Sequence, residues 1–362
     1  MKHRVVYKNK DKYSSFPLLT QMENRILIGY FTADIPDHTG VFRWQIQESF
    51  DEGETWKSHK SINAYSFYNW PATSSRERSD RFTYKLDGRE FTTGSFGFQR
   101  FFNLATSSQK LIKSNSLFVR SSGDRWQTID RKKYTMPFVD IVVTFPRPLM
   151  PRGSWEPTGL MLVPAYAVLP NGKNRALAWR SDDSGKTWYL YNMFPDECSI
   201  NEMAFLWVGN KILAHLRSDE HPYIMESWSD DGIVWTYPTN IDSGGYSVFG
   251  GPPHLLRLKD GRILCTYGYR KMPMGIRAII SNDNGQTWGK PDVLRMDGGW
   301  QSSLHKQSFW QKWTIWGNYE DKFGMDLGYP VSIQLSDEFI LTAYYITCED
   351  LITGIETTKW RV

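Results

Sequence analysis

Cysteine is scarce in this sequence, with three residues among 362. Cys198, Cys265 and Cys348 are odd in number and lie far apart. A disulfide scaffold needs paired cysteines, and a structural zinc site needs them closely spaced, so both classes are excluded. The low cysteine content also favours a reducing compartment.

Long apolar runs and a basic block are missing as well. No run approaches the roughly 18 apolar residues of a membrane-spanning helix. Residues 1–16 carry charges but lack the apolar core of about seven or more residues found in a secretion signal. The net charge is only +4, and no Lys/Arg cluster has the form of a nucleic-acid patch. We therefore expect a cytoplasmic protein without membrane or nucleic-acid partners, although secretion or surface display by another route stays open.

Aromatic residues, in contrast, are abundant, at 15% of the chain and with 16 Trp. Most of them are explained by packing in a core. A surplus of Trp and Tyr also suits surfaces that stack against sugars. The mild positive charge permits an acidic ligand, such as an acidic glycan or polysaccharide, without requiring one.

The sequence repeats one short motif, Ser-x-Asp-x-Gly-x-Thr-Trp. Full copies occupy 49–56, 181–188 and 281–288; a copy one residue shorter occupies 229–235, and a degraded copy 122–126. The pattern predicts a hairpin turn, in which Asp accepts hydrogen bonds from the backbone of the turn and Gly takes a positive φ. The Trp then folds back as an apolar plug. Repetition at this frequency indicates a repeat architecture.

This motif is the Asp-box, and the chain resembles the sialidase (neuraminidase) superfamily of BNR-repeat β-propellers. The box aspartates follow one another at intervals of 73, 59, 48 and 52 residues, which suits one four-stranded blade each. The resemblance implies an all-β, six-bladed β-propeller forming a single domain over residues 1–362. It also implies closure by pairing of the terminal strands, which we place at 4–7 and 357–362. The stretches 251–261, 267–270 and 326–330 resemble a bacterial sialidase-like branch.

Candidate catalytic residues lie where blades open, because the inner strand of each blade begins near the axis on one face. The resemblance implies glycoside hydrolysis of an acidic, sialic-acid-like sugar, with Tyr329 as nucleophile and Glu202 as its base. The acid/base residue belongs in the loop before residue 42, where we prefer Asp37, with His38 close behind. A neutral Tyr can approach an anionic anomeric centre that would repel a carboxylate, and sialidases are an exception to the rule of two carboxylates. No metal or organic cofactor is implied.

Arginines are expected to bind the substrate carboxylate, because their bidentate geometry matches it. Of the three clamp arginines in the family, Arg217 matches the second. Ser15 stands where the first belongs, and Met274, after Pro273, stands where the third belongs. Arg270 or Arg277 could substitute for the third, and we take Arg270 as the second anion contact. The incomplete clamp leaves the sugar specificity open.

Two other functions stay open. His254 with Tyr329 could act as the acid/base pair of a uronate-polysaccharide lyase or of another glycosidase. A propeller with an incomplete clamp could also be a non-catalytic glycan-binding protein. Structural roles are possible for each candidate: Glu202 as a loop cap, Arg217 as an ion pair with Asp219 or Glu220, and His254 and Tyr329 as core residues.

Residues 300–325 form a long aromatic excursion between two predicted strands. A connection of this length in a compact domain is usually functional. We expect Trp310 and Trp313 to contact substrate or a neighbouring subunit, so that an oligomer is possible.

Overall fold

The structure is a computed structural model that describes residues 1–21, 25–34, 43–58, 159–169, 171, 173–183, 187–246, 248–304 and 325–362, with the backbone of seven strands between residues 83 and 144. Contacts divide the chain into two compact units. The first unit is Met1–Asn69, His215–Glu226 and Thr239–Val362, and the second is Trp70–Ala214 and Ser227–Pro238. Each unit is described by itself.

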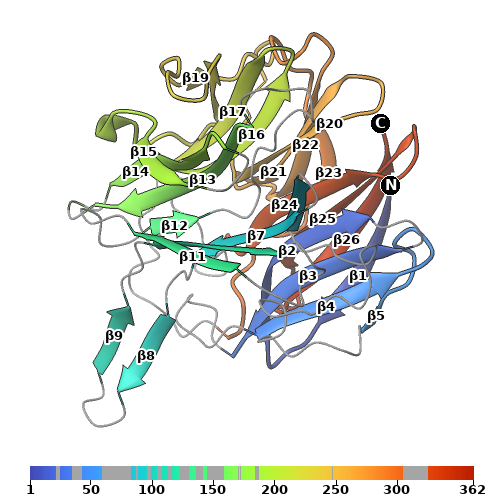
Figure 1. Ribbon diagram of the computed structural model, residues 1–362. Helices are drawn as coiled ribbons and strands as arrows, with labels where there is room; N and C mark the ends of the chain where they lie inside the picture. Colours follow the sequence, from blue (N-terminus) through green and yellow to red (C-terminus); the bar gives the residue numbers. More distant parts are fainter. Residues whose placement is uncertain are drawn as a thin grey trace. The chain divides into compact units, whose positions relative to one another are not determined.

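The first unit contains three complete four-stranded sheets (Figure 1). Their orders are β2-β3-β4-β5, β20-β21-β22-β23 and β1-β26-β25-β24. The strands are β1 (Lys2–Lys8), β2 (Tyr13–Gln21), β3 (Ile26–Ala33), β4 (Arg43–Ser49), β5 (Lys57–Ser58), β20 (Pro253–Arg257), β21 (Ile263–Tyr269), β22 (Gly275–Ser281), β23 (Asp292–Arg295), β24 (Leu327–Gln334), β25 (Phe339–Thr347) and β26 (Thr353–Arg361).

The second unit contains the sheets β11-β10-β7-β6 and β12-β13-β14-β15 and the hairpin β8-β9. The strands are β6 (Thr83–Leu86), β7 (Arg89–Ser95), β8 (Gln99–Asn103), β9 (Ser108–Ile112), β10 (Ser116–Ser122), β11 (Asp130–Thr135), β12 (Val142–Thr144), β13 (Met161–Val168), β14 (Asn174–Ser181) and β15 (Tyr189–Asn192), followed by the short 3-10 helix η1 (Asp196–Cys198). A sixth sheet has the order β16-β17-β18-β19, with β16 (Ile200–Val208), β17 (Lys211–Ser218), β18 (Met225–Ser229) and β19 (Thr239–Asn240). The boundary between the units passes through β17 and β18. Within the described ranges, no helix is long and apolar enough to span a bilayer.

The first and last strands of the chain share one sheet. β1 runs antiparallel to β26, with Lys2 opposite Lys359 and Lys8 opposite Gly354. The predicted pairing of the terminal strands is therefore confirmed. The ring of six blades that the resemblance implies, and its closure, stay predictions.

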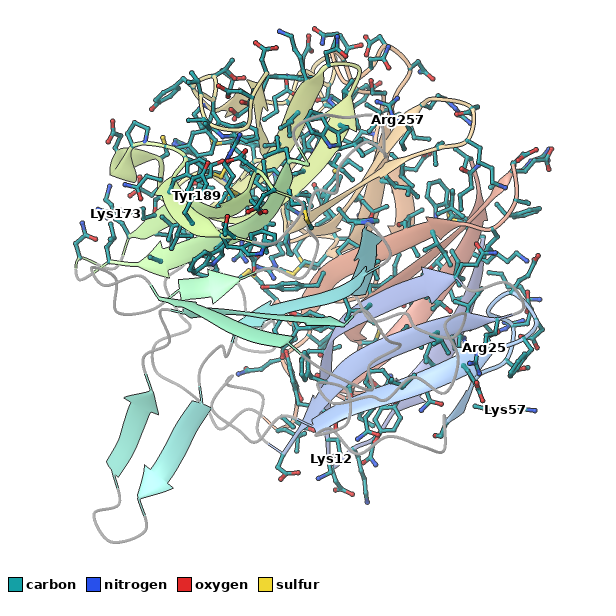
Figure 2. All side chains as sticks on the ribbon, in the orientation of Figure 1. Lys12, Arg25, Lys57, Lys173, Tyr189 and Arg257 are labelled. Carbon is teal, nitrogen blue, oxygen red and sulfur yellow. The ribbon has the colours of Figure 1, made fainter. Side chains whose placement is uncertain are left out.

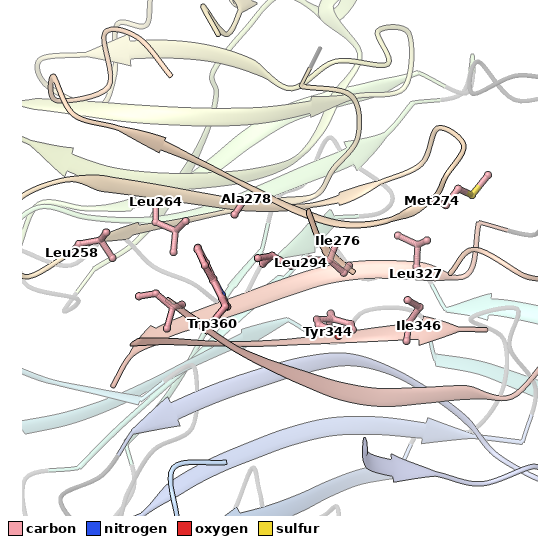
Figure 3. Close-up of a cluster of buried hydrophobic side chains, with 11 residues drawn as sticks. Leu258, Leu264, Met274, Ile276, Ala278, Leu294, Leu327, Tyr344, Ile346 and Trp360 are labelled. Carbon is pink, nitrogen blue, oxygen red and sulfur yellow. The ribbon is translucent and has the colours of Figure 1, made fainter. Parts of the chain in front are cut away.

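The sheet that contains β24, β25 and β26 is buried on both faces. On one face Leu327, Tyr344 and Trp360 pack against residues of β21 and β22, among them Leu264 and Ile276 (Figure 3). On the other face a second apolar cluster joins β25 to β2 and β3. The strand β25 is accordingly buried at every position after its first residue, as expected for a strand that is covered on both faces.

The full Asp-boxes with described side chains are built from short-range hydrogen bonds. In the third copy, Ser281 Oγ donates to Asp283 Oδ1 at 2.8 Å, and the Thr287 amide donates to the same oxygen at 2.9 Å. Gly285 takes a φ of 83°, and Trp288 is 3% exposed. Burial raises the pKa of Asp283, but the hydrogen bonds from Thr287 and Ser281 outweigh it and lower the pKa to about 2. The first copy repeats these bonds around Asp51.

Each of these boxes lies at one end of its sheet. Ser281 is paired with Ile263, whereas Tyr269 is paired with Gly275 at the other end of the β21–β22 pair. We call the end with the box the box end, and the end at which β2, β20 or β24 begins the entry end. In the sheet of β2, Figure 2 shows Lys12 at the entry end and Arg25 at the box end.

Candidate functional site

Three glycines allow strands to meet closely at the entry ends of the first unit. A Cβ atom on Gly268 would lie 3.0 Å from Gly328 Cα and 3.1 Å from the Gly251 carbonyl oxygen. Gly251 has a φ of 151° and Gly328 a φ of 133°, a region that other residues rarely adopt. Glycine is therefore required where β20, β21 and β24 converge. We call Gly251, Gly268 and Gly328 the glycine junction.

Two of the predicted anion-binding arginines border the glycine junction. The aliphatic part of Arg217 lies 3.1–3.2 Å from the position of a Cβ atom on Gly251. Arg270 Nη2 lies 3.7 Å from the position of a Cβ atom on Gly328 and donates to the Leu327 carbonyl oxygen at 3.3 Å. Arg217 Nη2 approaches Asp219 at 3.7 Å, a loose ion pair with a half-buried partner. The fold thus brings two guanidinium side chains to one small region.

Tyr329 follows the glycine junction directly on β24. Its φ is 50°, and the register of β24 against β25 shifts between Gly328 and Val331. Such bulges re-aim a side chain, and a positive φ in a non-glycine residue costs about 1–3 kcal/mol, so it persists only where the surroundings enforce it. Here the Tyr329 ring meets Phe16 edge-on at 4.6 Å and lies 5.9 Å from Tyr345.

Phe16 is the counterpart of Tyr329 in the neighbouring sheet. It has a φ of 53°, precedes a proline as Tyr329 does, and lies in the register shift of β2 between Ser15 and Leu18. The entry ends of β2 and β24 therefore share one backbone conformation, a positive φ within a register shift. It places an aromatic ring from each strand in contact with the other.

The buried acid Asp326 is hydrogen-bonded to a tyrosine that lies next to this aromatic cluster. Tyr13 Oη donates to Asp326 Oδ1 at 3.1 Å, and the Ser302 amide donates to Asp326 Oδ2 at 2.9 Å. Burial, followed by the charge of Asp326, raises the pKa of Tyr13 well above its ordinary value. The Tyr13 ring also lies 6.3 Å from the Tyr345 ring. Sequence reasoning missed Tyr13 and Ser302, because neither belongs to a motif and both reach Asp326 across long separations.

The aromatic excursion starts and ends at this acid. Ser302 lies near the start of the excursion and binds Asp326 through its amide. Met325, the last residue of the excursion, precedes Asp326 and donates its amide hydrogen to the Gly299 carbonyl oxygen at 3.1 Å. Trp310 and Trp313 lie outside the described residues, as do Asp37 and His38. Their predicted roles stay predictions.

The side chain of His254 accepts a hydrogen bond from the neighbouring strand β24. Its Nδ1 accepts from the Ser332 amide of β24 at 3.1 Å, and the side chain is buried. Because Nδ1 is the acceptor, the neutral ring carries its proton on Nε2. This geometry matches the structural role that the sequence left open for His254.

Glu202 lies on β16 in the second unit, whereas Arg217, Arg270 and Tyr329 lie in the first. It is 5% exposed, and its amide donates to Asn201 Oδ1 at 2.6 Å. The residue before β16, Ser199, has a φ of 44°, so this strand also starts from an unusual backbone conformation.

The positions where the family clamp is incomplete are filled by core residues. Ser15 is fully buried, and Met274 belongs to the apolar cluster below β24. Arg277 is engaged by the backbone, since it donates to the Pro273 carbonyl oxygen at 2.9 Å and the Arg295 carbonyl oxygen at 2.6 Å. Burial lowers its pKa. Of the two possible substitutes, Arg270 is therefore the one beside the glycine junction.

Comparison with known families agrees with the repeated motif. The model of the BNR repeat-like domain family matches residues 101–342. The chain belongs to this family. It is a sialidase-like member of the BNR-repeat superfamily. No curated protein sequence matches this BNR-repeat protein.

Solved structures similar to the BNR-repeat protein cover nearly all of it. A Dyadobacter fermentans protein of unknown function has a TM-score of 0.67 at 21% identity, covering 99% of this chain and 98% of its own. The NanB sialidase of Streptococcus pneumoniae has a TM-score of 0.57 at 12% identity, covering 99% and 70%. A Trypanosoma rangeli sialidase mutant has a TM-score of 0.55 at 13% identity. The BNR-repeat protein covers 99% of its own length in that match but spans only 58% of the sialidase. At these identities the likeness shows the fold alone.

Proposed function

We propose that this BNR-repeat protein is a glycoside hydrolase acting on an acidic, sialic-acid-like sugar. The observation that carries the proposal is the convergence of Arg217, Arg270 and Tyr329 on the glycine junction. Two guanidinium groups can bind a carboxylate through paired charge-assisted hydrogen bonds. A tyrosine held beside them can reach the anomeric carbon of the same sugar. The scaffold in this proposal is a six-bladed propeller, closed by the sheet that contains β1 and β26.

The proposed reaction proceeds in two displacements. The phenolic oxygen of Tyr329 attacks the anomeric carbon as the bond to the leaving oxygen breaks, and Glu202 takes the phenolic proton. Asp37, or His38, protonates the leaving alcohol. The same residue then removes a proton from a water molecule that attacks the glycosyl-tyrosine, and Glu202 returns the proton to Tyr329. Retention of configuration at the anomeric carbon follows from two inversions.

The packing of Tyr329 supports its role as nucleophile. A reacting group gains rate when it is held in the attacking geometry before substrate arrives. The edge-on contact with Phe16 and the proximity of Tyr345 restrict the ring, and the positive φ directs it away from the regular strand.

Glycan binding without catalysis is the second candidate function. It is favoured by Ser15 and Met274, two buried residues that place no cation at two of the three clamp positions. The hypothesis of a lyase is less well supported, because His254 Nδ1 already accepts a hydrogen bond from the Ser332 amide.

The decisive experiment combines a substrate panel with conservative variants. Aryl glycosides of acidic sugars and acidic polysaccharides are incubated with the protein, and both reducing ends and unsaturated products are measured. Tyr329→Phe should abolish turnover while binding is retained, since only the phenolic oxygen is lost. Glu202→Gln should lower kcat nearly as much. Tyr189→Phe, at a 45% exposed tyrosine of β15, is the matched control and should leave turnover unchanged.

The outcomes separate the candidates. If Tyr329→Phe and Glu202→Gln both stay within about tenfold of the native rate, which is about 1.4 kcal/mol of barrier, neither residue carries the chemistry. Unsaturated products that vanish in His254→Ala would indicate a lyase. Glycan binding without any turnover would establish the binding protein.

A further inference from the structure

A row of aromatic rings reaches the surface beside the glycine junction. Tyr223 meets Phe249 edge-on at 5.8 Å, and Phe249 lies 6.1 Å from Tyr269. The guanidinium of Arg277 covers the Tyr269 ring at 4.6 Å from its centroid. The row thus extends from the buried Arg277 to Tyr223, which is 37% exposed.

The backbone holds the outer end of the row rigidly. Tyr223 and Phe249 form an antiparallel bridge. The Gly250 amide donates to the Pro222 carbonyl oxygen, and the Ile224 amide to that of Val248, both at 2.9 Å. Tyr223 is therefore an exposed ring in a fixed position. Ligand binding would restrict it little further, so little conformational entropy is lost.

The row lies at the entry end, next to the two arginines. Phe249 precedes Gly250, and a Cβ atom on Gly250 would overlap the Gly268 carbonyl oxygen. The next residue, Gly251, packs against the aliphatic part of the Arg217 side chain. Tyr269 directly precedes Arg270 and pairs with Gly275 at the entry end of β21. The aromatic row is therefore adjacent to the arginine pair, because residues 249–251 and residues 269–270 each connect the two.

The surface around the row is apolar and positively charged. Lys271 Nζ lies 5.9 Å from the Phe249 ring centroid, and Met272 is 47% exposed. A sugar ring offers an apolar C–H face that stacks on aromatic side chains, together with hydroxyl or carboxylate oxygens that accept from an ammonium group. Tyr223 and Lys271 provide both kinds of contact.

We propose that Tyr223, supported by Phe249 and flanked by Lys271, forms a second sugar subsite. It binds the sugar unit adjacent to the acidic unit that Arg217 and Arg270 hold. This inference rests on the proposed function, because the acidic unit bound by Arg217 and Arg270 determines which sugar unit reaches Tyr223. It implies that the preferred ligand is an oligosaccharide with an acidic terminal unit rather than a single sugar.

Binding to two ligands that differ only in the second unit tests the subsite. The catalytically silenced Tyr329→Phe protein is titrated calorimetrically with sialyllactose and with the methyl glycoside of sialic acid, neither of which has an aryl group that could stack. Tyr223→Ala should weaken sialyllactose about tenfold and leave the methyl glycoside unchanged. Tyr223→Phe keeps the ring and should retain the affinity, and Lys271→Met should weaken sialyllactose severalfold. Tyr189→Ala, at an exposed tyrosine on β15, is the control.

Failure of the subsite and failure of the proposed function give different results. If Tyr223→Ala affects both ligands equally, or neither, the subsite is wrong. If Arg217→Ala and Arg270→Ala leave the methyl glycoside unaffected, the acidic unit is not bound where the proposed function places it. If the parent protein binds neither ligand, both proposals are overturned for sialic acid. Unchanged thermal unfolding of each variant shows that folding is intact.

Discussion

A buried histidine is expected to make the first unit sensitive to acid. His215 on β17 is fully buried, with Nδ1 3.3 Å from Cys265 Sγ and its ring 4.7 Å from Trp288. Glu226 Oε2 lies 3.9 Å from Nε2. Burial lowers the pKa of His215 from 6.5 to about 3, so the folded protein keeps this ring neutral.

This pKa predicts a loss of stability at mildly acidic pH. The unfolded chain protonates His215 near pH 6.5, whereas the folded chain protonates it only near pH 3. Between these values the unfolded state binds more protons, so the free energy of unfolding falls as pH decreases, by at most about 1.4 kcal/mol per pH unit. Urea denaturation between pH 7.5 and pH 4 measures the slope. His215→Gln should be less stable at pH 7.5 but should show a shallower slope.

The exposed His221 supplies the control for this prediction. His221→Gln changes the same residue type in the loop after β17 and should keep the native slope. Equal slopes in the native protein and in His215→Gln would show that other groups cause the acid sensitivity.

Candidate residues could be selected only where a motif pointed to them, and their roles stay predictions. Tyr329 and Arg217 could be selected because they match family positions in the sequence. The state of His254 could not, because it depends on Ser332, 78 residues further on. The positive φ of Tyr329 could not be predicted either, and the ring it contacts, Phe16, comes from the other end of the chain.

At the scale of elements, the Asp-box was predictable because its bonds are local. Asp283 binds Ser281 and Thr287, which lie two and four residues away. The glycine junction and the aromatic row are the opposite case. Gly251 and Gly328 are separated by 77 positions, and no short pattern marks either as a contact point. Sequence reasoning therefore found the turns but not the surface beside the arginines.

The Asp-box should lose its contribution to stability in acid. The pKa of Asp283 is about 2 in the folded protein and 3.8 as its ordinary value. A lowered carboxyl pKa stabilises the fold above the ordinary value, and this stability is lost as pH falls from about 4 to about 2. Asp283→Asn should therefore lower stability at pH 7 by about 1 kcal/mol and lower it less at pH 2.5. Thermal unfolding of both proteins at the two pH values measures the difference.

Asp337 provides a matched control outside the boxes. Its side chain is 89% exposed and forms a surface ion pair with Lys259 at 3.4 Å. Asp337→Asn should change stability by a few tenths of a kcal/mol at most. An Asp283→Asn effect no larger than this would refute the role of the box hydrogen bonds.

For the whole molecule, the pairing of β1 with β26 joins the two ends of the chain. β1 contributes little apolar burial of its own, since its first two residues are exposed. Its contacts include the β-ladder, the hydrogen bond between His3 and Thr358 at 2.9 Å, and the packing of Tyr7 on Tyr30 at 5.2 Å. The resemblance predicted this pairing, because a strand from the start of the chain covers an edge that would otherwise be open.

Deleting residues 1–8 should therefore destabilise the protein and promote self-association. The deletion removes β1 and uncovers the backbone edge of β26, which can then pair with another chain. We expect a lower unfolding temperature and a mass that rises with protein concentration in light scattering. Glu54→Ala is the matched control, because it removes only the exposed ion pairs of Glu54 with Lys2 and Arg4, which contribute about 0–1 kcal/mol. If the deleted protein stayed monomeric with an unchanged unfolding temperature, the β1–β26 pairing would not be what protects this edge.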